Sequence, residues 1–288
     1  MLAAIDLWNP HTGLPIPAVL VTAFLLGMVH GVTPDEHTWP ITFSYAIGAY
    51  SVRGGLIAGL TFSLAFTLQR AIASELAYLA LGRWLENPTV EAWVYIAVGI
   101  AMFVAGRYIR TRGQVFHLHG LKAHHHHFEE PPALPPQMAF WHGLIAGWGF
   151  GAFALIIYTV LAPAMHSAWL AWMPGALFGL GTMVVQASVG ALFGHWMRTI
   201  RLPEPLARRI ARKTAGNTLF FGGVAFTIAG MLSLVFPRLS DFAIVTPLHI
   251  HNLHTLGLGF LLVMVTVLVV GIGTLGRSIE QAKRQLRP

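Results

Sequence analysis

The sequence predicts an all-α protein: a polytopic membrane helix bundle of about seven spans, in which the first helix is interrupted. Three observations favour this fold class. Only 10% of the 288 residues are charged, whereas roughly a quarter are charged in an ordinary soluble domain. Hydrophobic residues make up 55% of the chain, and the mean hydropathy is +0.64. Most of the long apolar stretches also reach the length of about 20 residues that a helix needs to cross a bilayer.

The predicted elements follow in order along the chain. The first two apolar stretches, residues 15–31 and 38–51, are each short for a span, and Pro34 lies between them. Because proline lacks an amide proton and pushes the preceding residue away from helical angles, residues 15–51 are interpreted as one interrupted helical element. The later stretches are expected to be one span each: 54–81, 89–109, 138–165, 169–197, 215–236 and 253–275.

The distribution of basic residues predicts the orientation. Segments 107–122, 198–213 and 277–287 together hold 14 of the 18 Lys and Arg. Two spans separate each segment from the next, so all three would face the cytoplasm. This gives about seven crossings of the cytoplasmic membrane, with the N-terminus outside and the C-terminus inside. A re-entrant first element would instead put the N-terminus inside. Basic residues beside a membrane are suited to anionic lipid headgroups, and no nucleic-acid partner is expected.

A weak internal repeat divides what we interpret as a single integral membrane domain, residues 1–288. His30-Gly31 matches His142-Gly143, and residues 55–60 match residues 175–180. Each half, 14–109 and 138–236, has three spans, so the second copy must be inverted relative to the first, and a final span at 253–276 follows. Inverted repeats are common in secondary transporters, whose sites lie where discontinuous helices meet. Chance similarity between glycine-rich apolar helices is the alternative.

The absence of cysteine limits the chemistry. It excludes disulfide frameworks, thiolate metal sites and covalent c-type haem attachment. Any metal must therefore be held by histidine, carboxylate or main-chain ligands. The first basic residue is Arg53, so the N-terminus lacks the positive region of a cleaved signal peptide. We expect the first apolar segment to remain in the mature protein.

Ionisable side chains gather at the interruption of the first helix. Such groups cost a few kcal/mol each in hydrocarbon, so they normally mark an ion or substrate path. Imidazole nitrogens together with carboxylate oxygens suit borderline divalent ions such as Ni²⁺, Co²⁺ and Zn²⁺. A polar helix break that only packs is the alternative. The four residues are His30, Asp35, Glu36 and His37.

This segment carries a family resemblance. Residues 24–37 read FLLGMVHGVTPDEH, which resembles the signature of the nickel/cobalt transporter families, and is especially similar to the NicO efflux branch, where Leu-Gly-x-x-His-Gly precedes a proline and a second histidine. Residues 141–147, WHGLIAG, extend the likeness into the second half. The resemblance implies a divalent-metal permease of the LysE-like exporter superfamily, with His30, Asp35 and His37 as metal ligands. Glu36 would add a ligand or carry a counter-moving proton.

Four further polar residues are candidates for the same site. Gln69, Arg70 and Glu75 lie in or beside the stretch 54–81. A buried guanidinium needs a carboxylate, so Arg70 is expected to pair with an acid, either as a structural ion pair or as a coupling device that competes with metal or proton. His142 would bring a further metal donor from the second repeat, or would be a simple interfacial residue. The acids available to Arg70 are Glu75, Asp35 and Glu36.

Residues 110–137 are the only long hydrophilic connection, and are predicted to be a disordered cytoplasmic loop. Short histidine-rich tracts are compositional metal-binding signals, so the loop is predicted to capture or sense ions, a solvated loop without function being the alternative. Because imidazole must be deprotonated to bind metal, the loop should lose metal below about pH 6.5. Its histidines are His117, His119, His124, His125, His126 and His127. A further cluster on the predicted external side, at His249, His251 and His254, is interpreted as interfacial, with an entry or exit site as the alternative.

The predicted function is a secondary transporter of a divalent transition metal. No HExxH, GxSxG or phosphate-cradling motif occurs, so a membrane protease, a lipase and an ATP-driven pump lack their minimum parts, and no enzyme activity or prosthetic group is expected. Nickel or cobalt is the first choice of substrate, with zinc or iron after them. A LysE-like exporter of a small organic or anionic solute and a bis-histidine haem protein are the alternatives. Transport direction and oligomeric state, including a homo-oligomer, stay open.

Overall fold

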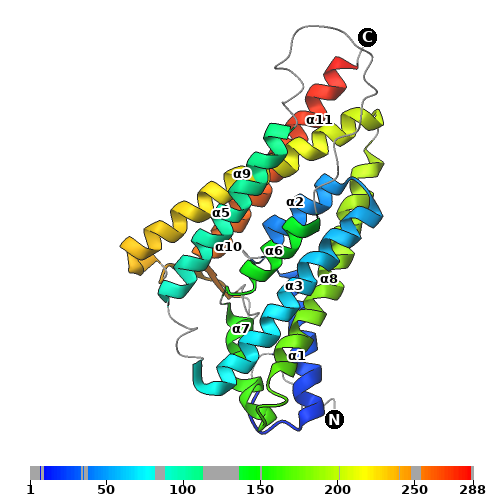
Figure 1. The fold of residues 1–288 in the computed structure, drawn as a ribbon. Coiled ribbons are helices and arrows are strands. Elements are labelled where there is room, and N and C mark those ends of the chain that lie inside the picture. The colour runs from blue at the N-terminus through cyan, green and yellow to red at the C-terminus, as the bar shows by residue number, and fades with distance from the viewer. Residues whose placement is uncertain are drawn as a thin grey trace.

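The computed structural model describes residues 7, 10–33, 35, 38–81, 88–112, 136–149, 151–200, 202–239, 241–247 and 254–286. The described chain is mostly helical, which confirms the predicted fold class at this level (Figure 1). Its elements are α1 (Ile16–Val32), α2 (Trp39–Ala49), α3 (Val52–Leu76), η2 (Ala77–Leu81), α5 (Pro88–Arg112), α6 (Pro136–Ala146), α7 (Ala152–Ile156), η4 (Ile157–Leu161), η5 (Pro163–Met165), α8 (Trp172–Thr199), α9 (Glu204–Val235), η6 (Pro237–Leu239), β1 (Ala243–Val245), β2 (Thr255–Gly257), α10 (Leu258–Val263), η7 (Met264–Ile272) and α11 (Gly273–Gln285).

Five helices of the described part are long and apolar enough to cross a membrane, and two shorter ones, Ile16–Val32 and Phe153–Met165, are also apolar. The outer surface of the bundle agrees with this, because large aliphatic side chains such as Leu64 and Leu192 point outward, 58% and 63% exposed. Such a surface is unfavourable in water and favourable in lipid. The chain is a membrane-embedded helical protein. The five long helices are Val52–Leu79, Thr89–Thr111, Trp172–Thr199, Glu204–Val235 and Leu258–Gln285.

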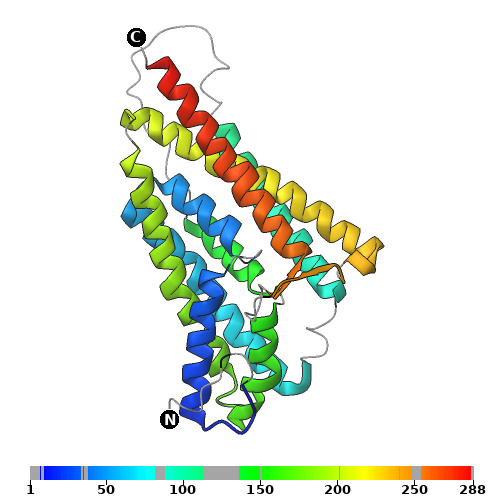
Figure 2. The same ribbon diagram turned by 180° about the vertical axis from the view of Figure 1, so that it is seen from behind.

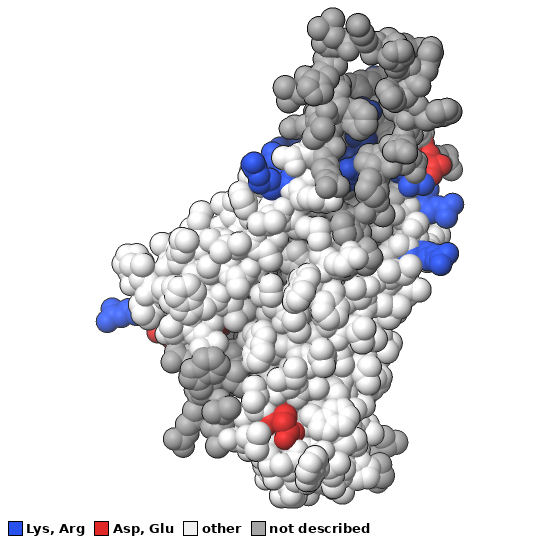
Figure 3. Space-filling model, viewed as in Figure 1, with Lys and Arg blue, Asp and Glu red and all other residues white. Residues whose placement is uncertain are grey.

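Lys and Arg gather at one end of the molecule, the end that holds the C-terminus (Figure 3). The helix termini there are the end of α5, the end of α8 and the beginning of α9. Much of the remaining surface in this view carries neither Lys, Arg, Asp nor Glu. This concentration of basic residues at one end is what the sequence predicts for the cytoplasmic end.

Helices α3 and α8 pack closely and antiparallel, because glycines let their backbones approach. An alanine methyl at Gly55 would lie 2.0 Å from the carbonyl oxygen of Gly190, and one at Gly175 would lie 2.0 Å from the carbonyl oxygen of Arg70. The beginning of each helix therefore meets the end of the other. Small residues at such contacts are the usual means of helix association in membranes, where apolar burial gives little driving force. Gly55 and Gly175 are the residues that the predicted internal repeat pairs.

The first helical element is interrupted as predicted: α1 ends at Val32 and α2 begins at Trp39. The two follow one another along the length of the bundle, α1 at the end that holds the N-terminus and α2 toward the opposite end (Figures 1 and 2). Thr33, the last residue before Pro34, has φ −72° and ψ 138°, which is the extended conformation that a following proline imposes. The proline therefore explains where α1 stops.

A second interruption was not predicted. The stretch 138–165 was expected to form one span, but α6 ends at Ala146 and α7 begins at Ala152. Gly147, Gly149 and Gly151 occupy this connection, and glycine weakens a helix because it has more backbone freedom to lose. Both halves of the chain therefore open with a broken helix. We refer to residues 33–38 as the first break and residues 147–151 as the second break.

The last part of the chain also differs from the expectation. The final span was placed at 253–276, whereas the helical segment runs from Leu258 through η7 to Gln285, with η7 wound as a π-helix over Met264–Ile272. Before it, β1 and β2 form an antiparallel hairpin in which Ile244 faces Leu256. No strand was predicted, because a three-residue strand leaves too short a pattern to recognise.

Candidate functional site at the two helix breaks

His30 lies in the last turn of α1, directly before the first break, and is 3% exposed. Its Nδ1 lies 3.8 Å from a carboxylate oxygen of Asp35, which is equally buried. This distance is too long for a hydrogen bond, and neither imidazole nitrogen has a hydrogen-bond partner in the described part of the chain. The break therefore brings an imidazole nitrogen and a carboxylate oxygen close together without a hydrogen bond between them.

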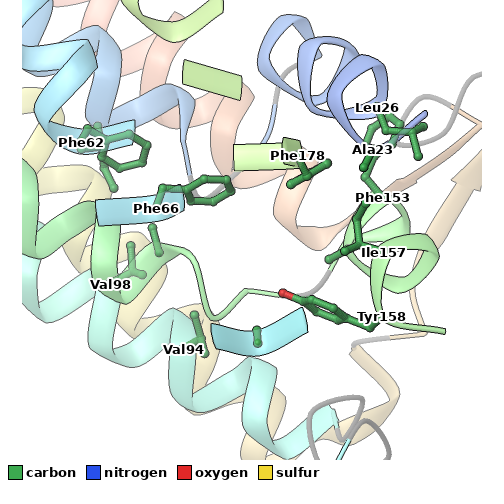
Figure 4. Packing of buried hydrophobic residues seen from close by; sticks show 14 of the residues in the cluster. Ala23, Leu26, Phe62, Phe66, Val94, Val98, Phe153, Ile157, Tyr158 and Phe178 are labelled. Carbon is green, nitrogen blue, oxygen red and sulfur yellow. The ribbon is translucent and has the colours of Figure 1, made fainter. Parts of the chain in front are cut away.

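Aromatic rings surround the His30 imidazole. The ring centroids of Phe66, Phe153 and Phe178 lie 5.8, 5.8 and 5.0 Å from that of His30, and they come from α3, α7 and α8. Figure 4 shows Phe66, Phe153, Phe178 and Tyr158 gathered around one region of the core. We call the three phenylalanine rings, which pack around the His30 side chain, the aromatic chamber. Because its walls are apolar, a charge inside it is shielded from water and interacts strongly with its neighbours.

Helix α8 supplies polar groups to the end of α1. The last carbonyls of a helix have no partner within the helix and must be satisfied from outside. The side-chain amide of Gln186 donates to the carbonyl oxygen of Gly31, one of these last carbonyls, at 3.2 Å, and the hydroxyl of Thr182 donates at 3.1 Å to the carbonyl oxygen of Gly27, one turn earlier. These bonds fix the position of His30, which lies between the two glycines.

Arg70 of α3 lies at the second break and is 2% exposed. Its Nη1 donates to the hydroxyl of Tyr158 at 2.7 Å, and its Nη2 donates to the carbonyl oxygen of Gly149 at 3.0 Å. The guanidinium carbon lies 4.7 Å from the ring centroid of Phe66 and 5.6 Å from that of Phe178. Arg70 and His30 therefore share two walls of the aromatic chamber.

The carboxylate expected beside Arg70 is missing: none lies within ion-pair distance in the described residues. Glu75, one of the expected partners, lies in a shallow depression with Ala71, Ile72 and Trp172, and its Oε2 is buried without a hydrogen-bond partner there. The prediction of an ion pair was therefore wrong for Glu75 and Asp35. The actual partners of Arg70, a carbonyl and a phenol, are neutral.

Gln69 lies against the same break. It is 1% exposed, and neither end of its amide has a hydrogen-bond partner in the described part. An alanine methyl at Gly147 would lie 2.3 Å from the Gln69 Oε1, so the Gln69 amide would have to move if residue 147 carried a side chain. Gln69 and Arg70 together place two strongly polar, incompletely bonded side chains at the second break.

His142 is buried in α6 and is held by other groups. Its Nδ1 lies 2.8 Å from the carbonyl oxygen of Met138 and 3.0 Å from the hydroxyl of Tyr45, which is on α2. Its Nε2 is buried without a hydrogen-bond partner in the described chain. The structure thus links His142 to the helix that follows the first break, and not to His30 directly.

The remaining predicted residues fall into two groups. His254 is exposed in the described part. His195 of α8, which is not among the predicted ligands, is exposed as well. The others lie outside the described residues: Glu36, His37, His249, His251 and the loop histidines His117, His119, His124, His125, His126 and His127. Among the described residues, no three His, Asp or Glu side chains form a group that could hold a metal ion. Of the predicted ligands at the first break, the described residues bring His30 and Asp35 together.

Sequence reasoning missed the neutral members of the site. Tyr158, Gly149 and Tyr45 each contact a predicted residue at a separation of 79 to 97 positions, which no local pattern reveals. One signal was present: the alternation of Gly147, Gly149 and Gly151 inside an apolar stretch marks a weak helix.

Comparison with known proteins finds no matching family model, no matching curated protein and no matching solved structure.

Proposed function

We propose that the chain is a permease for divalent transition-metal ions in the cytoplasmic membrane, with nickel or cobalt as the first choice of substrate. The observation that carries the proposal is the His30 and Asp35 pair, buried at a proline-broken helix in a membrane-embedded bundle. Two ionisable groups in such surroundings are costly to maintain, and they normally mark an ion path. Their nitrogen and oxygen donors suit borderline divalent ions.

The arrangement of helices supports a transport mechanism. Each half contributes a broken helix and two long helices: α1–α2, α3 and α5 in the first, α6–α7, α8 and α9 in the second. The antiparallel packing of α3 against α8 fits two inverted repeats followed by a final span, seven crossings in all. In such transporters the repeats rock around a site near the membrane midplane.

In this mechanism His30 and Asp35 replace part of the water shell of the ion. Glu36 and His37, the next ionisable residues at the first break, would complete the ligand set, and Glu36 is also the candidate carrier of a counter-moving proton. The aromatic chamber excludes water, so an ion must exchange its hydration shell for protein ligands before it passes. The basic end of the bundle would face the cytoplasm.

A second candidate function is export of a small anionic solute. The observation that favours it is Arg70, a buried guanidinium without a carboxylate partner in the described residues. On this alternative the solute itself would be the missing counter-charge, and His30 would have no part in transport.

Flux of radioactive nickel into proteoliposomes distinguishes the two candidates. The wild type, His30→Ala and Asp35→Asn are compared with His195→Ala, a matched control in which an exposed histidine is removed. The permease predicts nickel flux that is lost in both site variants and kept in the control. Equal fluxes in the wild type and His30→Ala would overturn the ligand assignment.

A further inference from the structure

Arg70 carries a positive charge that the described protein does not neutralise by contact. Arginine stays protonated in proteins, so burial cannot remove the charge. A buried charge without a partner costs several kcal/mol, and proteins normally supply a counter-charge. No carboxylate lies within ion-pair distance of Arg70 among the described residues, and the carboxylate of Asp35 lies 3.8 Å from His30 instead.

The second break offers unused donors around this charge. A guanidinium has five N–H groups, and the bonds to Tyr158 and Gly149 use two of them. The Nε of Arg70 is among the remaining donors and is buried without a partner in the described part. The side-chain amide nitrogen of Gln69, the neighbouring residue on α3, is also buried without a hydrogen-bond partner in the described part. Both side chains are more than nine-tenths buried.

The charge balance of the aromatic chamber also calls for an anion when a metal enters. A divalent ion and Arg70 would bring three positive charges, whereas the described carboxylate beside His30, that of Asp35, brings one negative charge. His30 adds none while it is neutral. An excess of positive charge in an apolar enclosure is strongly unfavourable, because charges there interact with little screening.

We infer that the side chains of Arg70 and Gln69, beside the second break, form a binding site for a small inorganic anion such as chloride, which accompanies the divalent cation. His30 and Asp35 hold the cation at the first break, and Arg70 and Gln69 hold the anion beside the second break. Gly147 leaves space for the Gln69 side chain, and the carbonyl oxygen of Gly149 accepts from Arg70. This inference rests on the proposed metal transport, which it deepens by naming the co-substrate.

Two measurements on the full-length purified protein test the site. The first is nickel flux into proteoliposomes at a clamped membrane potential, with chloride or with the bulky anion gluconate as the only anion. We expect flux in chloride to be roughly fivefold or more above flux in gluconate. The second is thermal unfolding in detergent, without nickel, as sodium chloride replaces sodium gluconate at constant ionic strength. We expect chloride to raise the melting temperature, because a ligand that binds only the folded state stabilises it.

Arg70→Lys keeps the charge but loses the donors at Nε and the planar fork, and Arg70→Gln loses the charge. Both should abolish the chloride effect in each measurement. The matched control is Arg110→Gln, which removes a guanidinium that also lies over aromatic rings, Phe220 and Phe221, away from the breaks. That variant should keep the chloride effect. If Arg70→Gln does not fold, the wild type and Arg70→Lys still decide the question.

Three outcomes of these measurements separate the anion site from the proposed metal transport. Nickel flux that is equal in chloride and gluconate, with no thermal effect of chloride, overturns the anion site and leaves the permease intact. A thermal effect that depends on Arg70, in a protein that moves no nickel, supports the anion site and overturns the proposed metal transport. A thermal effect of chloride that survives in both Arg70 variants places the anion elsewhere and overturns the assignment.

Discussion

The Nδ1 of His30 lies 3.8 Å from a carboxylate oxygen of Asp35, across the point where the first membrane helix stops. His30 belongs to the last turn of α1, and Asp35 follows the proline that ends the helix. A metal ion between them would bind each at about 2.0–2.2 Å, so the present gap is open enough to admit an ion after small side-chain movements. The helix break, and not the helix itself, makes this approach possible.

Removing either member of this pair should weaken nickel binding. We expect His30→Ala and Asp35→Asn each to lower the affinity roughly tenfold or more, because each removes one ligand from a small set. Competition against a fluorescent nickel chelator in detergent measures the change. His195→Ala removes an exposed histidine of α8 and should leave the affinity unchanged. An unaltered affinity in His30→Ala would show that the ion binds elsewhere.

Tyr45 and His142 should matter for stability more than for nickel affinity. Tyr45→Phe removes the hydroxyl that bonds the His142 Nδ1, and should lower the free energy of unfolding by about 0.5–1.5 kcal/mol. Thermal unfolding in detergent checks this. His142→Ala should likewise lower the melting temperature and keep the nickel affinity of the wild type. If nickel affinity falls in His142→Ala and not in Tyr45→Phe, His142 is a direct ligand, as its sequence position first indicated.

The close packing of α1 against α8 predicts that an added methyl group destabilises the protein at Gly27 but not at Gly276. An alanine methyl at Gly27 would lie 1.9 Å from the carbonyl oxygen of Phe178, so Gly27→Ala must push α1 away from α8. We expect destabilisation of about 1–3 kcal/mol, the usual cost of overpacking, together with reduced nickel flux because His30 is displaced. Gly276→Ala, where the added methyl meets nothing within 4 Å, should unfold at the same temperature as the wild type or slightly above it. Equal stability of the two variants would contradict the α1–α8 contact.

The histidine-rich loop should affect nickel capture and not the maximum rate. Replacing His124, His125, His126 and His127 by alanine should raise the nickel concentration at half-maximal flux and leave the maximum unchanged. Imidazole is ordinarily neutral above about pH 6.5 and protonated below it, so the advantage of the wild type should be present at neutral pH and lost at about pH 5.5. Initial rates at the two pH values measure this. An advantage that persists in acid would exclude capture by imidazole.

The two helix breaks differ in how well the local sequence predicts them. Pro34 made the first break predictable, because the effect of proline on the preceding residue is local, and Thr33 has the expected extended conformation. The second break was missed because Gly147, Gly149 and Gly151 lie in a stretch that is otherwise uniformly apolar, and glycine only weakens a helix. Tertiary packing decides whether such a stretch bends, and the contacts of Gln69 and Arg70 with the break are part of that packing.

The partners of Arg70 illustrate the same limit. From the sequence, a buried guanidinium was expected to pair with a carboxylate, and the candidates were the acids in or near the membrane spans. The structure instead gives a carbonyl freed by the second break and a phenol from η4, both more than 70 residues away. Ionisable residues in membrane spans can be recognised from sequence because they are rare there, but their neutral partners cannot, since tyrosines and glycines are common in such spans.

Anomalous scattering from crystals soaked with nickel, recorded on both sides of the nickel absorption edge, tests the central claim most directly. The account predicts one strong nickel peak at the first break, within about 2.0–2.2 Å of an imidazole nitrogen of His30 and a carboxylate oxygen of Asp35. A fully occupied peak elsewhere, with the His30 and Asp35 side chains unchanged and free of metal, would contradict it.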